Sequence, residues 1–338
     1  MNSNESFLVG IHCMTYNHAS YIEDALNGFV MQKTSFPYFA LVVDDASLDG
    51  EQEIIKSYLD KHFDHSENTG YKQWETDDAS WIYSRHKENE NCFFVVVFLK
   101  RNLFGNPQKW EVLKDWLNIT KYIAICEGDD YWTDPMKLQK QVDFLEAYED
   151  YSMCFHAAKI LLQGVDKKKT GAQCEHIEAR DYSSTEVFER WIVPTASIVY
   201  RKKMIDQFVM KHPEWLTRGD IALVLKCSHS GKIRGMSDCM SVYRMQPNSV
   251  SHNPQYRGKE VFRLPNHFRC IFINFHQVDK APIKWNIASA YFSRMKAERG
   301  IDRIRDFFLA FYWDPQLVFK KTKKTVVSHF SFRNSRQS

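Results

Sequence analysis

The chain has 338 residues, 44% hydrophobic and 26% charged, which are ordinary values for a globular protein and exclude a disordered or fibrous one. Its 45 Lys and Arg residues nearly balance its 42 Asp and Glu residues, which excludes nucleic-acid binding through a strongly basic surface. No run approaches the roughly 18 apolar residues of a membrane span, and residues 1–6 lack a secretory signal pattern. We therefore expect a cytoplasmic chain, soluble or peripheral to the inner face of a membrane.

The eight cysteines agree with a reducing compartment. They include no Cys-x-x-Cys pair, and several lie inside apolar, strand-like runs. Cysteines in such positions behave as small buried hydrophobic residues. We therefore interpret them as buried free thiols.

The first half of the chain alternates apolar runs with amphipathic segments. Helical spacing of apolar residues predicts helices over residues 22–30 and 49–59 and after Asp134-Pro135. Continuous apolar strands separated by helices are typical of a parallel sheet covered on both faces, so we expect an α/β fold. The four predicted strands span residues 7–12, 38–43, 92–99 and 122–126.

The remaining segments are less regular. Residues 62–91 are polar and show no sustained period, so we expect an insertion or a loop there, with Asp77-Asp78 in solvent. Residues 232–244 have the pattern of a strand, and the chain beyond Phe262 has that of helices. Near its end an apolar stripe precedes a stretch, residues 318–338, with six Lys or Arg and no acid. The stripe consists of Ile301, Ile304, Phe307, Phe308 and Phe311.

Two carboxylate pairs follow predicted strands. Asp44-Asp45 ends the second strand and Asp129-Asp130 follows the fourth, so parallel topology brings both pairs to one edge of the sheet. Their mutual repulsion is usually relieved by a hard divalent ion shared with substrate phosphates, while a single carboxylate can bind a base or ribose. Neither a G-x-G-x-x-G nor a Walker A motif occurs. The pattern therefore favours a nucleotide-diphosphate site built from carboxylates and metal.

These residues carry a family resemblance. The sequence resembles the family 2 glycosyltransferases, inverting enzymes with the GT-A (nucleotide-diphospho-sugar transferase) fold, from Phe7 to about His252. That fold has a mostly parallel central sheet flanked by helices, here with a helical C-terminal extension. The motifs that carry the resemblance are Thr15-Tyr16-Asn17, Val42 to Gly50, Tyr122 to Trp132 with Asp134-Pro135, and Asn102-Leu103-Phe104-Gly105.

The resemblance implies roles for the donor-side residues. Asp45 would contact the base, and Asp130 is the best candidate for coordinating Mg²⁺ or Mn²⁺. Glu127 stands where the family more often has Asp, so it ranks last among the metal ligands. The implied nucleotide-binding residues are Thr15, Tyr16, Asn17, Asp44, Asp45, Asn102 and Asp129, and the implied metal ligands are Asp130, Asp129 and Glu127.

The resemblance also implies an acceptor side. Asp220, at the start of a predicted helix, corresponds to the general base that takes the proton of the acceptor hydroxyl. The alternative, compatible with catalysis, is that Asp220 caps this helix. Gln246 stands where the family frequently has His. The acceptor-side residues are Thr195, Ser197, Trp132, Tyr243 and Arg244.

The expected organisation is a GT-A catalytic domain over residues 1–255 and a helical extension with a basic tail over residues 256–338. Within the first, residues 1–135 would bind the nucleotide, residues 136–255 would bind the acceptor, and residues 62–91 would form the insertion. The C-terminal stripe and tail suit peripheral contact with an anionic membrane, or else packing on the catalytic lobe, and both remain open.

The expected function is inverting transfer of a sugar from a nucleotide-diphosphate sugar, UDP-linked before GDP-linked. The acceptor would be a saccharide or lipid-linked saccharide in surface-polysaccharide biosynthesis. The alternatives are a catalytically silent nucleotide-sugar-binding or scaffold protein and a nucleotidyltransferase. The second is disfavoured because Thr15-Tyr16-Asn17-His18 is unlike the glycine-rich loop of that class.

Overall fold

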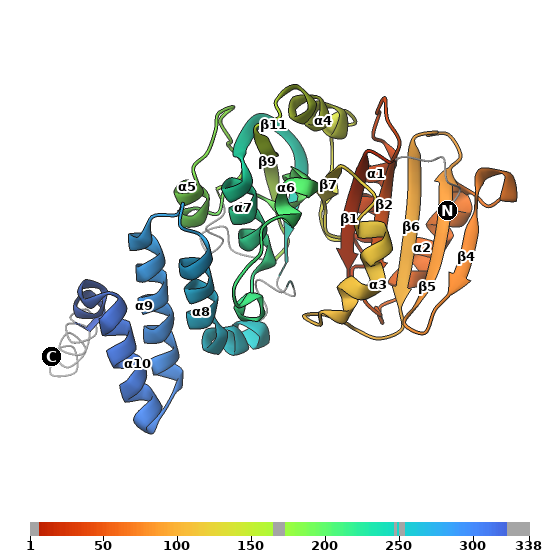
Figure 1. Cartoon of the computed structure of the whole chain (residues 1–338). Helices are drawn as coiled ribbons and strands as arrows, with labels where there is room; N and C mark the ends of the chain where they lie inside the picture. The colour runs from red at the N-terminus through yellow and green to blue at the C-terminus, as the bar shows by residue number, and fades with distance from the viewer. Residues whose placement is uncertain (1–6, 165–172, 247–248, 250–253, 323–338) are drawn as a thin grey trace, which may run out of the picture. The chain divides into compact units, whose positions relative to one another are not determined.

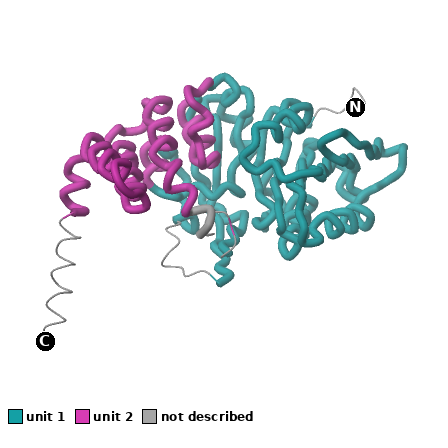
Figure 2. The backbone as a smooth tube through the Cα atoms, turned by 90° about the horizontal axis from the view of Figure 1, so that it is seen from below, with its two compact units in different colours: residues 1–183, 190–208, 230–246 teal, residues 184–189, 209–229, 247–338 magenta. Residues whose placement is uncertain are grey.

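The computed structural model describes residues 7–164, 173–246, 249 and 254–322 (Figure 1). The chain forms two compact units (Figure 2). Unit 1 comprises residues 1–183, 190–208 and 230–246, and unit 2 comprises residues 184–189, 209–229 and 247–338. Residues 209–229, which contain Asp220, therefore group with the C-terminal helices and not with the sheet.

The centre of unit 1 is a parallel sheet in the order β6-β2-β1-β7. Each strand coincides closely with one of the four apolar runs, so the predicted α/β class and its parallel core are confirmed. Every residue of β2 and β6 is buried, as expected for strands covered on both faces. The strands are β1 (Val9–Thr15), β2 (Tyr38–Asp44), β6 (Cys92–Leu99) and β7 (Tyr122–Ile125).

Helices cover both faces of this sheet (Figure 1). Successive strand residues point to opposite faces, so Val42 packs in one core while Leu41 and Val43 pack in the other. The first core includes apolar residues of α1 (Ile22–Val30), α2 (Glu51–His62) and α4 (Lys137–Ala147). The second includes those of α3 (Gln108–Leu117).

Antiparallel strands extend the sheet on the β6 side, where the sequence predicted an insertion or loop. The loop alternative was wrong for residues 79–86, because β5 (Ala79–His86) pairs antiparallel with β6, while the insertion stays a prediction. Ala79, Trp81 and Tyr83 are buried at alternate positions, a short period-two pattern flanked by charged residues. Asp77-Asp78 does lie in the turn between two strands, as predicted. The other strands here are β3 (Phe63–Asp64) and β4 (Lys72–Glu75), both paired with β5.

The β7 side continues through strands that support the acidic loop. β10 is antiparallel to both β7 and β9, β9 is parallel to β11, and β8 is antiparallel to β11. The predicted strand over residues 232–244 is confirmed as β11. These elements are β8 (Tyr131–Trp132), β9 (Tyr151–Leu162), β10 (Val199–Arg201), β11 (Lys232–Met245) and the short helix α6 (Lys202–Asp206).

Unit 2 is helical, which confirms the predicted C-terminal extension. Its core includes Ile271 of α8, Ile283 and Ile287 of α9, and Phe275 between the two helices. Among the described residues, no helix is long and apolar enough to cross a membrane. All eight cysteines are free, and seven are buried. The helices of unit 2 are α5 (Ser184–Glu189), α7 (Gly219–Ser230), α8 (Pro254–Asn274), α9 (Lys280–Ala297), α10 (Gly300–Trp313) and a last helix over residues 315–322.

Candidate active site

Four loops leave the carboxyl ends of β1, β2, β6 and β7, and parallel pairing places them along one edge of the sheet. Both carboxylate pairs lie on this edge, as the sequence predicted. Two non-glycine residues here have left-handed backbone, Asn17 with φ 57° and Ala46 with φ 61°. Such backbone persists only where surrounding contacts fix it, and it concentrates at functional sites.

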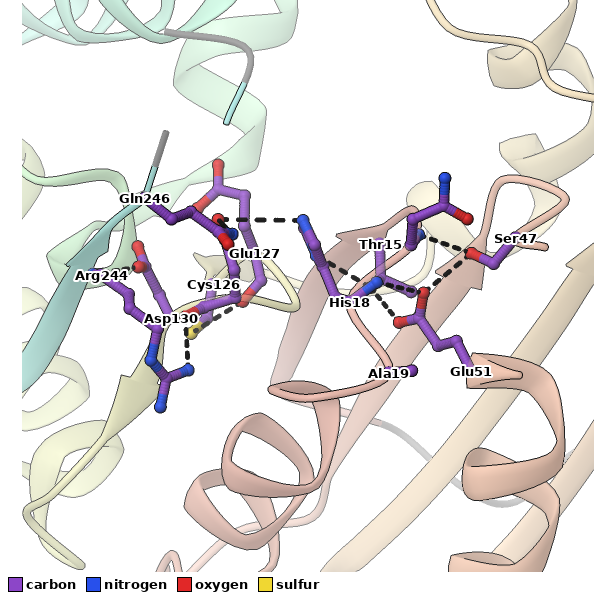
Figure 3. A network of polar contacts seen from close by, with 12 residues as sticks. Thr15, His18, Ala19, Ser47, Glu51, Cys126, Glu127, Asp130, Arg244 and Gln246 are labelled. Atoms are coloured by element: carbon purple, nitrogen blue, oxygen red, sulfur yellow. Dashed lines mark hydrogen bonds and ion pairs between the residues drawn. The ribbon is translucent and has the colours of Figure 1, made fainter. Parts of the chain in front are cut away.

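A buried carboxylate that sequence reasoning missed, Glu51, ties two of these loops together (Figure 3). The Thr15 hydroxyl donates to Glu51, and so do the His18 backbone N–H, at 2.9 Å, and the Ser47 hydroxyl, at 2.8 Å. Burial raises the pKa of the Glu51 carboxyl, although these donors oppose the shift. Its position as the first residue of α2 was the available signal, because a helix N-terminus favours an acid.

The loop after β7 lies directly against the end of β1. A Cβ at Gly128 would collide with the Thr15 side chain, so only glycine allows this approach. Asp129 Oδ2 then lies 3.8 Å from His18 Nε2 and accepts a hydrogen bond of 3.2 Å from Gln246 Nε2. The acidic loop and the Thr15-to-His18 segment therefore form one polar network (Figure 3).

The two aspartates of this loop have different environments. Asp130 is 2% exposed, and its carboxylate accepts the Arg244 backbone N–H at 2.8 Å. Burial, followed by the neighbouring charges of Asp129 and Glu127, raises the pKa of Asp130 well above its usual range. The Asp129 side chain is 15% exposed. The structure thus makes Asp130 the inner carboxylate and Asp129 the outer one, whereas the sequence ranked Asp130 first for direct coordination.

Arg244 supports this loop from β11. Its guanidinium donates to the Asp129 carbonyl oxygen at 2.7 Å and to the Asp24 carboxylate at 2.6 Å, and it lies over the Tyr21 and Tyr131 rings. These contacts occupy the Arg244 guanidinium, which the sequence analysis assigned to the acceptor side. Arg244 positions the acidic loop.

Across the described ranges of the chain, no three His, Cys, Asp or Glu side chains are arranged as a metal site. The chemistry of the loop nevertheless fits a hard divalent cation. Glu127, Asp129 and Asp130 supply carboxylate oxygens. Besides burial, the charges of Asp129 and Glu127 raise the pKa of Asp130, and a cation would relieve that repulsion. Of these, Asp129 is the outer carboxylate that a cation shared with a diphosphate would contact.

Both carboxylates of the first pair, Asp44-Asp45, have partners within the protein. Asp45 accepts the Lys109 ammonium and the Leu103 backbone N–H, each at 2.6 Å. Asp44 accepts the Gln52 side-chain amide at 2.6 Å. Lys109 was missed by sequence reasoning, since it lies 64 residues from Asp45 with no motif linking the two. A base bound here would meet a carboxylate already shared with an ammonium.

The other residues predicted to bind the nucleotide line the same edge. Asn102 donates to the Asp45 carbonyl oxygen at 3.0 Å and accepts the Phe104 N–H at 3.1 Å, so its side chain shapes the loop after β6. The Asn17 side chain accepts the Leu48 N–H at 2.9 Å. Tyr16 is 39% exposed, which leaves its ring free to stack on a flat ligand.

Two predicted acceptor-side residues belong to the core instead. Trp132 is 2% exposed, and its indole N–H donates to the Ala196 carbonyl at 2.8 Å. Ser197 is fully buried and donates to the Pro194 carbonyl at 2.6 Å. Both side chains therefore make structural contacts in the core, whereas Thr195 stays partly exposed. Burial, and then the charge of Asp130, raises the pKa of Tyr243, which is partly exposed.

The predicted general base, Asp220, belongs to unit 2. It lies within the first turn of α7 and accepts the Ile221 N–H at 2.8 Å, so it is inside the helix and not at the cap. Burial raises the pKa of Asp220, opposed by that hydrogen bond and by Arg218. Arg218 is itself paired with Glu260 at 2.7 Å. A carboxylate with a raised pKa is a stronger base, which suits proton abstraction.

Comparison with known proteins finds relatives of this chain. No protein-family model matches the chain. It is 28% identical over 261 residues to the uncharacterized protein Rv1520 of Mycobacterium tuberculosis, a match that covers 77% of this chain and 65% of that protein. It is 24% identical over 257 residues to TuaG of Bacillus subtilis, a putative teichuronic acid biosynthesis glycosyltransferase, covering 75% of this chain and 86% of TuaG. The chain thus spans slightly less than two thirds of the mycobacterial relative.

Among solved structures, S. aureus TarS in complex with UDP aligns with a TM-score of 0.56 at 16% identity, over 92% of this chain and 82% of that one. The chain is family 2 glycosyltransferase-like. Its fold is of the GT-A type, α/β with a mostly parallel central sheet and a helical C-terminal region. The family resemblance and the fold class expected from the sequence are therefore both confirmed.

Proposed function

We propose that the chain is a glycosyltransferase of surface-polysaccharide assembly that acts in the cytoplasm. It moves one sugar, with inversion, from a UDP-linked donor to a saccharide or lipid-linked saccharide. The observation that carries this proposal is the acidic loop after β7, held against the end of β1 with Asp129 outermost. The similarity to TuaG, a putative teichuronic acid biosynthesis glycosyltransferase, and to the UDP complex of TarS supports the same class of reaction.

In this mechanism the loops of unit 1 hold the donor. The Tyr16 ring and the loop containing Asp45 bind the base and ribose, and Glu51 keeps the loops after β1 and β2 in place. Mg²⁺ or Mn²⁺ would be held by Asp129 together with Asp130 and Glu127 of the same loop, and would neutralise charge on the leaving diphosphate. Gln246 and Arg244 keep Asp129 in position through its side chain and its carbonyl.

Asp220 is the proposed base. The acceptor hydroxyl gives its proton to the Asp220 carboxylate, and its oxygen forms a bond to the anomeric carbon. The bond between that carbon and the phosphate oxygen breaks at the same time, and the nucleoside diphosphate leaves. Attack opposite the leaving group inverts the anomeric configuration.

The experiment is a release assay with a panel of UDP-sugars and GDP-sugars, with and without saccharide and lipid-linked saccharide acceptors. We expect acceptor-dependent release of UDP by the wild-type chain and none by Asp220→Asn. Equal release by that variant would contradict the assignment of the base.

A silent nucleotide-sugar-binding protein is the second candidate. It is favoured by one observation, the Lys109–Asp45 pair, which neutralises a carboxylate expected to contact the donor. Binding of UDP-sugars without release, under every acceptor condition, would establish this alternative.

A further inference from the structure

The outer face of α10 in unit 2 is apolar and uncovered. Ile301, Ile304, Phe308, Phe311 and Tyr312 lie within one arc of the helix, because they are separated by three, seven, ten and eleven residues from the first. All five are exposed, Ile301 by 81% and Tyr312 by 77%. We call them the α10 apolar face. Contiguous apolar surface of this kind marks a site of interaction.

The opposite side of α10 shows why this face points outward. Asp306, fully buried, accepts two hydrogen bonds from the Arg294 guanidinium of α9, at 2.6 and 2.7 Å. Ala310, also buried, lies one turn further along. A helix that packs on its neighbour normally buries its apolar stripe and exposes its charges. Here an ion pair fixes the reverse orientation, so exposure of the apolar face is built into unit 2.

The surroundings of the face are basic and aromatic. Phe319, in the last helix, contacts Phe311 with ring centroids 5.7 Å apart and is itself exposed, so the apolar surface continues beyond α10. Arg303, Arg305 and Lys320 are exposed on the same two helices, and Arg305 pairs with the exposed Asp302 at 2.7 Å. In the sequence, residues 318–338 carry six Lys or Arg and no acid. Such charge complements an anionic surface, whereas a second copy of the chain would bring basic residues against basic residues.

We propose that the α10 apolar face docks on an anionic lipid bilayer, with its aromatic side chains in the headgroup layer and the basic residues on the phosphates. Amphipathic helices with aromatic and aliphatic residues on one face and basic residues beside it bind membranes in this way. The docking site does not depend on the proposed transferase activity. If that activity holds, docking brings the enzyme to lipid-linked acceptors.

The test is co-sedimentation of the full chain with vesicles, in the absence of donor and acceptor. One set of vesicles is phosphatidylcholine, and the other contains about one third phosphatidylglycerol. The variant is Ile304→Ser with Phe308→Ser, both at exposed positions and therefore compatible with folding, which circular dichroism checks. The control is Val209→Ser, which removes an even more exposed apolar side chain elsewhere in unit 2.

We expect the wild type and the control to bind anionic vesicles, less strongly when NaCl rises from about 0.1 M to about 0.5 M. The double variant should lose at least about 10-fold in partitioning, since two large side chains no longer enter the bilayer. No binding by the wild type, or equal binding by the double variant, would overturn the proposal. A lipid-free dimer that the double variant converts to a monomer, with no vesicle binding, would assign the face to a second copy instead.

Discussion

The two carboxylate pairs on the sheet edge look alike in the sequence and differ in the structure. Asp45 is paired with the Lys109 ammonium and the Leu103 backbone N–H, and Asp44 accepts the Gln52 side-chain amide. Asp129-Asp130 keeps an excess of negative charge, which Arg244 offsets only in part. Burial, and then the charges of Asp129 and Glu127, raises the pKa of Asp130. Two acids at the end of a strand therefore indicate a functional edge of the sheet. The basic side chains near them decide whether these acids shape a pocket or attract a metal-bound ligand.

A third carboxylate, outside both pairs, gives the largest expected effect. Asp220→Asn should lower the transfer rate by about 10²–10⁴-fold, because the acceptor hydroxyl loses its base. The affinity for UDP should stay unchanged, since Asp220 serves only the acceptor. Steady-state kinetics and nucleotide titration separate the two. A variant that loses both would show that Asp220 supports the fold and not the chemistry.

The same residue predicts a pH dependence. Asp220 accepts a proton only when ionised, and burial raises its pKa. As the pH falls through that raised pKa, kcat/KM should decline, with the acid limb above the usual range of an aspartate. A pH–rate profile of the wild type checks this. An acid limb at the ordinary aspartate pKa would contradict a base with a raised pKa.

The ion pair between Lys109 and Asp45 can be broken directly. Lys109→Met leaves the Asp45 carboxylate buried without its ammonium, and removal of one partner of a buried ion pair costs about 3–5 kcal/mol in the free energy of unfolding. Urea unfolding measures the change. The double variant Lys109→Met with Asp45→Asn should recover most of the loss. A single variant as stable as the wild type would remove the distinction between the two carboxylate pairs.

A smaller effect is expected at Gly128. Gly128→Ala forces a methyl group against the Thr15 side chain and should destabilise the chain by about 1–3 kcal/mol, with weaker UDP binding as the acidic loop moves. Gly258→Ala is the matched control, because its Cβ meets open space within α8 and should be neutral or slightly stabilising. Equal effects of the two substitutions would mean that the loop does not depend on close approach to β1.

Much of unit 1 was predictable from sequence because its signals are local. Continuous apolar runs specified β2 and β6, and the motif from Tyr122 to Trp132 specified the acidic loop. The strand β5 was missed because charged residues flank its short alternating pattern. Lys109 and the outward face of α10 were also beyond reach. Each depends on a partner that only the folded chain brings close: Asp45 for Lys109, and Arg294 for the Asp306 side of α10.

The most direct test of the account is calorimetric titration of UDP into the metal-free chain, with and without Mn²⁺, for the wild type, Asp129→Asn and the control Asp77→Asn. Asp77 is an exposed carboxylate in the turn before β5. We expect the wild type and Asp77→Asn to bind UDP tightly only when Mn²⁺ is present. The Asp129→Asn variant should lose that metal dependence. Equal binding with and without the metal, or an Asp129→Asn variant that binds like the wild type, would contradict the account.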